Sequence, residues 1–444
     1  MAPDDRSRPT FGSFFGALMT FIGVAVGLGN FWRFPYMAAA FGGGAFLLVY
    51  LGIVVAFGVP AAAAEFTLGR LTRRGPLGAF RAIGMPGGRA AGWMVVITIF
   101  VASSYYAVVV GWVLQYTGYA ITGAIGRTAA DALFQSLLGS VWTQFGATAV
   151  VLGLAALVLI LGVRTGIERW SAIGMPVLFV LLIVIIARVL TLPGAGPGLR
   201  FYFIPDFSKI NAGVIAAALG QAFFSLSLGG TFHVTYGSYL PASTDLPRSA
   251  WGTAIGDTLA AVFDGLIIVP AAVTFGLDLA SGPPLTFVIV PRIFEQVAGG
   301  PAFAALFFGS LFFAAFLSSV AGLEVVVAML MDEFRVTRWM AVLGLCGTEL
   351  LLAIPAMRSV DWILKSDLFW GSTMQPVGSA FALVALAWVV GKGRALEEVR
   401  RGAQGRGFGT LWFYWIRYVV PVGIVVILVL GLKDVFATFL GQAR

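Results

Sequence analysis

Apolar runs recur along the whole of this 444-residue chain. Each holds roughly 20 residues, which is the length that a helix needs to cross a bilayer. Because hydrocarbon offers no partners for backbone N–H and C=O groups, a continuous apolar run satisfies them by forming a helix. Charged residues make up 11% of the chain, against roughly 25% in soluble domains. We therefore predict an all-α polytopic membrane protein with about 11 transmembrane helices.

The predicted spans are joined by short connections. Their bounds are 12–37, 43–70, 90–123, 141–162, 168–190, 212–240, 250–276, 303–333, 338–356, 367–391 and 410–432. Basic residues gather in alternate connections, notably Arg70, Arg73, Arg74, Arg81 and Arg89 in one and Lys392, Arg394, Arg400, Arg401 and Arg406 in another. The positive-inside rule then predicts a cytoplasmic N-terminus and an external C-terminus. The net charge of +8 is explained by this orientation, without nucleic acid as a partner. Short loops and compact termini favour a bacterial cytoplasmic (inner) membrane.

Two of the spans are interrupted. In the stretch 23–50, GVAVGLGNFWRFPYMAAAFGGGAFLLVY, the first span breaks around Ala25–Gly29, with Asn30 and Arg33 just beyond. The sixth span breaks around Ser227–Gly230. A spanning helix unwinds only where protein, water or a ligand satisfies its backbone groups. Both breaks therefore predict a binding site, although close packing of helices against glycine is an alternative explanation.

The two breaks occupy corresponding places in two halves of the chain. They lie five spans apart, so a duplicated unit of five helices would be inserted upside down. Paired broken helices of this kind are typical of inverted-repeat transporters with a site at the midplane. We predict a single transmembrane domain over 1–444, with a first repeat over 12–190, an inverted second repeat over 212–391 and an additional helix over 410–432.

The first broken span also carries a specific motif. Residues Asn30–Tyr36 read NFWRFPY, and Gly42–Phe46 read GGGAF. This stretch resembles the first helix of the neurotransmitter:sodium symporter family, in its bacterial amino-acid transporter branch. The resemblance covers nearly the whole chain and implies a leucine-transporter-like fold. It also implies sodium-coupled secondary active symport of an amino acid into the cell by alternating access, with a monomer or weak homodimer in the lipid bilayer.

Other functions remain open at this point. A proton-coupled transporter of the same fold would use Asp257 or Glu65 as the proton carrier. A non-transporting ligand sensor or a membrane-embedded enzyme would accumulate nothing. The chain has one His and one Cys, which leaves no basis for a zinc cluster or a disulfide framework. Because it also shows no phosphate loop and no nucleophile–base pair, we expect that it is not an enzyme.

The resemblance implies a first sodium site at the two breaks, completed by the carboxylate of the substrate. Its ligands would be the Ala25 carbonyl, the Asn30 amide oxygen, Ser225 and Asp257. Many family members have asparagine where this chain has Asp257. In chloride-dependent members the chloride lies close by, among the positions of Tyr50, Gln221 and Ser225. A fixed carboxylate would replace that anion, so we expect no chloride requirement.

A second sodium site is less well supported. The resemblance places it at the carbonyls of Gly23, Val26 and Ala314 and at Ser318. Leu317, however, stands where the first side-chain ligand belongs, and leucine cannot coordinate sodium. Three explanations remain: a weakened site, a shifted register that uses Ser318 and Ser319, or coupling to one sodium ion.

The substrate pocket is expected to hold a carboxylate. Amine transporters of the family carry an aspartate at the position of Gly27, and free amides at a helix start favour an anion. The implied substrate-binding residues are Ala25, Gly27, Gly29, Ala102, Tyr106, Phe224, Ser225, Ser227, Gly230, Ser318 and Gly322. Gly230 and Gly322 are smaller than their counterparts in the leucine transporter, which favours a large hydrophobic or aromatic L-amino acid. Phe223, Phe232 and Phe316 would refill that space if they faced it.

Charged residues at the two ends of the site suggest gates. The resemblance implies an outer gate between Arg33 and Asp367, although an arginine that snorkels to the interface is an alternative for Arg33. An inner gate would join Arg8 to Asp332. Glu65 would accept hydrogen bonds from backbone amides at the sixth-span break, which is a structural role.

Overall fold

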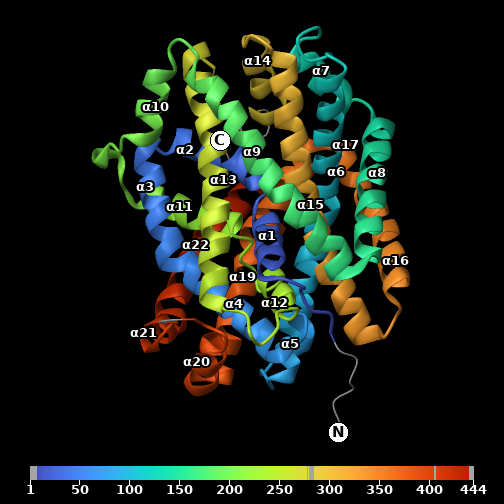
Figure 1. The fold of residues 1–444 in the computed structure, drawn as a ribbon, viewed down its shortest axis with the longest axis vertical. Helices are drawn as coiled ribbons and strands as arrows, with labels where there is room; N and C mark the ends of the chain where they lie inside the picture. The colour runs from blue at the N-terminus through green and yellow to red at the C-terminus, as the bar shows by residue number, and fades with distance from the viewer. Residues whose placement is uncertain (1–7, 278, 280–284, 405–406, 440–444) are drawn as a thin grey trace.

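The structure is a computed structural model that describes residues 8–277, 279, 285–404 and 407–439. Within these residues the regular structure is helical, apart from an isolated bridge between Ile125 and Thr128. The helices stand side by side as a bundle, with α1 near its centre (Figure 1). The prediction of an all-α polytopic membrane protein is confirmed.

The first half of the chain forms spans that are divided by short turns and amphipathic helices. Their bounds are α1 (Phe14–Ala25), η1 (Gly29–Arg33), α2 (Phe34–Ala40), α3 (Gly44–Ile53), η2 (Val54–Gly58), α4 (Val59–Thr72), α5 (Pro76–Ala82), α6 (Gly88–Ile121), α7 (Ala130–Leu138), α8 (Val141–Ile160), η3 (Val163–Glu168), α9 (Arg169–Leu190) and α10 (Ala195–Phe203). Several long spans contain a π-helical turn, such as η2 between α3 and α4.

The second half of the chain likewise consists of spans divided by short turns and short helices. Its elements are η4 (Phe207–Lys209), α11 (Ala212–Ser225), α12 (Phe232–Gly237), α13 (Leu246–Phe275), η5 (Leu285–Ile289), α14 (Val290–Glu295), α15 (Gly300–Phe334), α16 (Arg338–Leu352), α17 (Ile354–Arg358), α18 (Val360–Ser366), η6 (Asp367–Met374), α19 (Gln375–Val384), η7 (Ala385–Val390), α20 (Lys392–Arg400), α21 (Thr410–Tyr414), η8 (Trp415–Val419) and α22 (Val420–Phe439). The bounds proposed for the two repeats stay a prediction.

Both predicted breaks are present. Nine helices within the described residues are long and apolar enough to cross a membrane, and a tenth span is the pair Phe14–Ala25 and Gly29–Ala40, bent by 52°. The remaining predicted span, 212–240, consists of the apolar helix α11 and the short helix α12. Residues Leu226–Thr231 separate these two helices. The interruptions therefore occur where the sequence places glycine beside polar residues.

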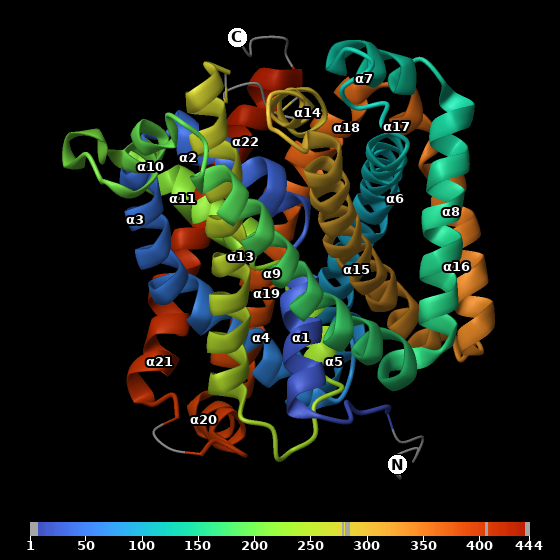
Figure 2. The ribbon, with the colours of Figure 1, turned by 45° about the horizontal axis from the view of Figure 1, so that its top comes forward.

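Two long helices form the interior support of the bundle. The 34-residue α6 and the 35-residue α15 lie side by side, and α8 and α16 flank them on one side (Figures 1 and 2). Large apolar side chains face outward elsewhere, including Trp142 (82% exposed), Leu157 (62%) and Leu411 (78%). Apolar surface on this scale is unfavourable in water but suits lipid.

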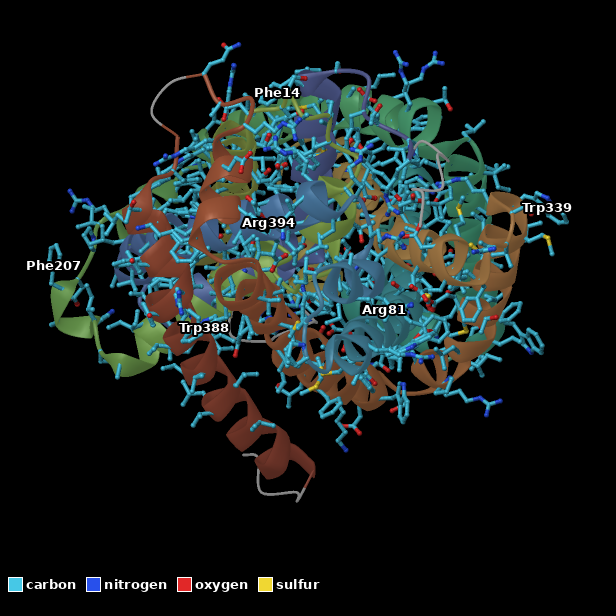
Figure 3. All side chains as sticks on the ribbon, turned by 90° about the horizontal axis from the view of Figure 1, so that it is seen from below. Phe14, Arg81, Phe207, Trp339, Trp388 and Arg394 are labelled. Carbon is cyan, nitrogen blue, oxygen red and sulfur yellow. The ribbon has the colours of Figure 1, made fainter. Side chains whose placement is uncertain are left out.

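The two basic segments lie at the same end of the bundle. Arg81 belongs to α5 and Arg394 to α20, and Figure 3 shows both residues in the view from below. Helix α1 also begins near this end, whereas α22 runs toward the opposite end (Figure 2). This arrangement agrees with the predicted topology, and the side of the membrane that each end faces stays a prediction.

The start of the first span is held by the start of the fifth. The backbone N–H of Gly12 donates to Oε2 of Glu168 at 2.7 Å, and the N–H and hydroxyl of Ser13 donate to Oε1 at 3.0 Å. A Cβ on Gly16 would overlap the Glu168 carboxylate, so glycine at this position permits the contact. A carboxylate is favourable here because it pairs with N–H groups that the helix leaves free.

This contact generates a prediction about stability. Replacing Glu168 with alanine should leave the N–H groups before α1 without their partner, and should cost about 1–3 kcal/mol of folding stability. Thermal unfolding in detergent should show a clearly lower midpoint for Glu168→Ala. Glu397 is exposed on α20 and provides the matched control. An equal shift for Glu397→Ala would contradict this role.

Candidate functional site

The break in the first span exposes backbone groups that side chains from other helices satisfy. Helix α1 ends at Ala25, and Val26 has extended backbone angles. The carbonyl of Val24 accepts hydrogen bonds from Ser227 Oγ at 3.2 Å and Ser318 Oγ at 3.3 Å. Beyond the break, the Gly27 N–H donates to Asn30 Oδ1 at 3.0 Å. Three distant segments therefore meet at this interruption.

The break in the sixth span is stabilised from the second span. The N–H of Gly230 donates to Oε1 of Glu65 at 3.0 Å, which is the type of contact expected for Glu65. Gly230 has φ +64°, and Ser227 has φ +53°, so both adopt the left-handed region. This region is disfavoured for a residue with a Cβ unless its surroundings impose it.

Beside the two breaks lies a buried polar cluster around Asp257 on α13. Asp257 accepts hydrogen bonds from Asn30 Nδ2 at 2.8 Å, from Ser225 Oγ at 2.8 Å and from the Tyr50 hydroxyl at 3.5 Å. None of the four side chains belongs to a residue that is more than 1% exposed. A buried carboxylate with hydroxyl and carbonyl oxygens nearby is a donor set that suits a hard cation such as sodium.

The orientation of Asn30 differs from the ligand role expected for it. Its amide nitrogen faces Asp257, while its oxygen accepts from Gly27 N–H. The reason is that a carboxylate needs donors, and the amide nitrogen supplies one. The structure brings Ser225 and Asp257 together with Asn30 as expected, Ala25 lines a cavity with Ser225, and the role of all four as ligands stays a prediction.

At the second predicted cation site, leucine faces the broken span. A Cβ placed on Gly23 would lie 3.3 Å from Leu317 Cδ1 and 3.4 Å from Met175 Sδ. Leu317 itself is 3% exposed. Apolar atoms thus lie against Gly23, while Ser318 turns its hydroxyl to Val24. Together with Val26 and Ala314, these residues offer fewer side-chain oxygens than the cluster at Asp257.

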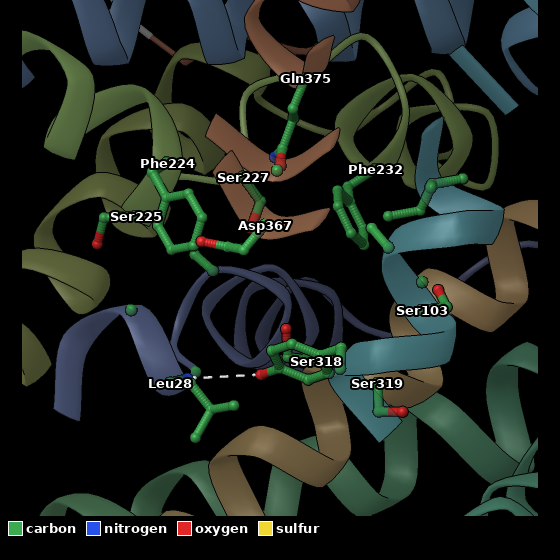
Figure 4. A pocket seen from close by; sticks show the side chains of 18 of the residues that line it. Leu28, Ser103, Phe224, Ser225, Ser227, Phe232, Ser318, Ser319, Asp367 and Gln375 are labelled. Atoms are coloured by element: carbon green, nitrogen blue, oxygen red, sulfur yellow. Dashed lines mark hydrogen bonds between the residues drawn. The ribbon is translucent and has the colours of Figure 1, made fainter. Parts of the chain in front are cut away.

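A cavity opens between the two breaks and the scaffold helices (Figure 4). Together with the solvent space at its mouth, it contains about 640 Å³ that is not filled by protein atoms. Its lining residues are Ala25, Gly27, Leu28, Gly29, Ile99, Ala102, Ser103, Tyr105, Tyr106, Phe224, Ser225, Ser227, Phe232, Ser318, Ser319, Gly322, Asp367, Gly371 and Gln375. Every residue predicted to bind substrate is among them except Gly230.

Gly230 is not among the residues that line the cavity, and its expected role in substrate binding stays a prediction. A Cβ on Gly230 would overlap the carbonyl oxygen of Gly378, so this glycine allows span 6 to approach α19 closely. Phe232, two residues later, lines the cavity instead. The left-handed turn at Gly230 redirects the chain, and sequence alignment alone does not reveal which later residue then faces inward.

Several lining residues were not predicted from the sequence. They are Ser103, Tyr105, Ser319, Gly371 and Gln375, and Asp367 lines the cavity in addition to its expected position at the outer gate. The sequence spacing of three of these lining residues could have indicated that they lie together. Asp367, Gly371 and Gln375 are four residues apart, and residues at this spacing share one helix face. The sequence does not reveal which face meets the cavity.

The two residues of the expected outer gate, Arg33 and Asp367, contact different partners in this structure. Among the described residues, Arg33 and Asp367 form no ion pair. Arg33 lies over the Phe224 ring at 4.3 Å and donates to Ser372 Oγ at 3.4 Å, whereas Asp367 accepts from the Tyr105 hydroxyl at 3.3 Å. Both residues, together with Phe224, line a smaller cavity with about 440 Å³ of empty space. The expected outer-gate contact is therefore absent from this conformation.

The opposite end is closed by charged residues. Arg8 donates to both carboxylate oxygens of Asp332, at 2.8 and 2.7 Å, and lies over the Tyr239 ring. Burial lowers the pKa of Arg8, but the negative charge of Tyr239 and Asp332 in their ionised forms outweighs it, so the pKa is raised above its usual value. Tyr239 also donates to Glu324, which pairs with Arg338 at 2.5 Å. The expected inner pair thus belongs to a larger network.

Comparison with known proteins gives a consistent result. The model of the sodium:neurotransmitter symporter family matches residues 8–134 and 134–441. The uncharacterized sodium-dependent transporter YhdH of Bacillus subtilis is 34% identical over 431 residues, which cover 93% of this chain and 95% of that protein. An uncharacterized sodium-dependent transporter of Haemophilus influenzae is 33% identical over 457 residues, covering 97% and 100%. The crystal structure of MhsT in complex with L-phenylalanine matches with a TM-score of 0.86 and 35% identity, covering 95% and 99%.

The position of Gly230 leads to a prediction. In Gly230→Ala the new Cβ would meet the Gly378 carbonyl in a left-handed backbone, and we expect a loss of about 1–3 kcal/mol of folding stability. Thermal unfolding in detergent measures it. Gly196→Ala is the control, because a Cβ there meets nothing within 4 Å. If Gly230→Ala were as stable as the control and only bound ligand more weakly, Gly230 would belong to the pocket after all.

Proposed function

The chain belongs to the sodium:neurotransmitter symporter family and is similar to sodium-dependent transporters, and from that premise we propose that it imports an amino acid by sodium-coupled symport. The proposed substrate is a large hydrophobic or aromatic L-amino acid. The chain is a multi-pass membrane protein of a transporter family. Its N-terminus is proposed to face the cytoplasm, so that the Arg8–Asp332 network closes the inner side.

One observation carries the proposal: the cation cluster and the cavity share residues. Ala25 and Ser225 line the cavity, and Ser225 also donates to Asp257. A carboxylate near Gly27 and Gly29 would lie next to the oxygens proposed to bind sodium. Each ligand then stabilises the other, because an anion beside a cation lowers the free energy of both in a buried site. Such reciprocity couples transport of the amino acid to the sodium gradient.

The end of the cavity at the first break favours a carboxylate. The Leu28 N–H points toward the Tyr106 hydroxyl, at 3.4 Å, and lies at the start of a helix where free amides attract anions. At Gly27 a Cβ would lie 2.8 Å from the same hydroxyl, so no acidic side chain fits there. These features support an α-amino acid over a monoamine.

The remaining walls support a large apolar side chain. Ile99, Ala102, Phe224 and Phe232 line the cavity, and burial of apolar surface contributes roughly 25 cal/mol per Å². MhsT, which shares the fold at a TM-score of 0.86, was crystallised with L-phenylalanine. That complex supports a ligand of similar size for this chain.

The structure also supports a conformational cycle. The inner network is closed while Arg33 and Asp367 are apart, which is the arrangement proposed for a state that admits substrate from outside. Substrate would bring Phe224 and Tyr106 together as a lid, and Arg33 would then pair with Asp367. Opening of the inner side requires release of Arg8 from Asp332 and of Gly12 and Ser13 from Glu168.

Transport in proteoliposomes tests this function. Under an inward sodium gradient we expect accumulation of labelled L-phenylalanine, and replacement of sodium by choline should abolish it. Replacement of chloride by gluconate should change the initial rate by less than about twofold, because the buried Asp257 carboxylate supplies the negative charge. Asp257→Ala should transport nothing, since it removes both a proposed ligand and that charge.

Three outcomes would contradict the proposal in different ways. Uptake that follows a proton gradient and ignores sodium would favour a proton-coupled transporter. Uptake that needs chloride in the wild type would exclude Asp257 as the substitute for a chloride ion. A purified protein that binds the amino acid but accumulates none would favour a ligand sensor.

The leucine at position 317 predicts how many sodium ions accompany each substrate molecule. With one working site, the sodium dependence of uptake should have a Hill coefficient of about 1. Leu317→Thr would place a hydroxyl beside Gly23, and the coefficient should rise toward about 2. Leu311→Thr, buried earlier on the same helix, serves as the control. A wild-type coefficient near 2 would show that a second site functions despite Leu317.

A further inference from the structure

Besides Tyr105, Tyr106 and Ser318, four polar side chains line the cavity without belonging to either broken span. Ser103 comes from α6, Ser319 from α15, Asp367 from η6 and Gln375 from α19. We call them the polar set. Figure 4 shows Asp367 and Gln375 between Phe224 and Phe232, whereas Ser103 and Ser319 lie apart from them, beyond Phe232. The proposed first sodium site and the proposed carboxylate site use none of these residues.

The polar set has hydrogen-bonding capacity that the protein leaves unused. Ser319 Oγ is buried and has no partner among the described residues. Asp367 accepts from the Tyr105 hydroxyl through Oδ1, so Oδ2 can accept a further donor. No hydrogen bond within the described chain engages the Gln375 amide. Buried polar groups are normally paired, and a group that stays unpaired is costly.

Two glycines leave polar atoms open to the cavity. A Cβ on Gly322 would lie 2.9 Å from Ser103 Oγ. A Cβ on Gly371 would lie 2.7 Å from Asp367 Oδ1 and 3.2 Å from the Tyr105 hydroxyl. Any larger residue at either position would cover these atoms. The absence of side chains at both positions therefore makes the wall more polar as well as the cavity larger.

An aliphatic side chain fits this wall poorly. It would remove water from the polar set and leave the Asp367 carboxylate and the Ser319 hydroxyl without partners. A short polar side chain fits poorly as well, because it would leave the apolar walls at Ile99, Ala102 and Phe232 without contact. The side chain that satisfies both is a large aromatic ring with a hydrogen-bond donor on it.

We propose that this transporter selects aromatic amino acids that carry a ring donor, a phenol O–H or an indole N–H, and that the polar set recognises that donor. The Gln375 carbonyl accepts its hydrogen, Asp367 and Ser319 keep the adjoining wall polar, and Ile99, Ala102 and Phe232 contact the ring. This inference rests on the proposed function, since it names the substrate of the same cavity. It also assigns Gln375 and Ser319 to specificity.

Competition for uptake tests the inference with matched ligands. Sodium-driven uptake of labelled L-phenylalanine is measured in proteoliposomes with unlabelled L-tyrosine, L-tryptophan or 4-methyl-L-phenylalanine. The last has nearly the shape of tyrosine but lacks the donor. L-Tyrosine and L-tryptophan should inhibit at concentrations about tenfold lower than 4-methyl-L-phenylalanine does.

Two variants locate the selectivity. In Gln375→Leu, and to a smaller extent in Ser319→Ala, the ratio of inhibition constants between 4-methyl-L-phenylalanine and L-tyrosine should fall from about ten toward about one. A ratio within one variant is unaffected by a loss of active protein, so reduced expression cannot mimic the result. Gln135→Leu, at an exposed position on α7, is the matched control and should keep the wild-type ratio.

The possible results separate this inference from the proposed function. If uptake is sodium-driven but 4-methyl-L-phenylalanine inhibits as strongly as L-tyrosine, the selectivity is wrong and the symport stands. A preference for L-tyrosine that survives in both variants would overturn the assignment to Gln375 and Ser319. If no amino acid is taken up with sodium, the proposed function fails, and this inference fails with it.

Discussion

The need to satisfy backbone groups inside the bilayer governs this structure. A membrane helix that breaks exposes N–H and C=O groups that lipid cannot bond, so other segments must supply partners. Here the partners are hydroxyls for the Val24 carbonyl, Asn30 for the Gly27 amide and Glu65 for the Gly230 amide. These contacts draw spans 1, 2, 6 and 8 together, and the cavity and the cation cluster lie where they meet.

The need to pair buried polar groups also connects the site with the inner end of the bundle. Glu168 satisfies the amides before α1, and the pair of Arg8 and Asp332 holds the chain just ahead of it. Both contacts act on the first span, whose break also contributes to the cavity. Movement of the inner half of span 1 therefore has to break ion pairs and hydrogen bonds at one end while it changes the site at the other.

Much of the site could be predicted from the residues. The glycines around Gly27 and the break at Ser227 indicated where the helices open, and Asn30, Ser225 and Asp257 do lie together. Gly230 shows the limit of such prediction: the resemblance placed it at the pocket, whereas its left-handed backbone packs against Gly378 and Phe232 lines the cavity. Gln375 was not predicted, and Ser319 was considered only as a sodium ligand, because nothing local distinguishes a polar residue that faces a cavity from one that faces a neighbouring helix.

By itself, the sequence determined that the chain crosses a membrane, how long its helices are and where two of them break. These properties follow from local chemistry: the length of apolar runs, the flexibility of glycine and the solvation of the backbone. Only the tertiary structure decided which polar groups share the cavity and that leucine faces Gly23 at the second cation position. Those outcomes depend on the rotation and register of helices that are hundreds of residues apart, and packing against neighbouring helices determines both.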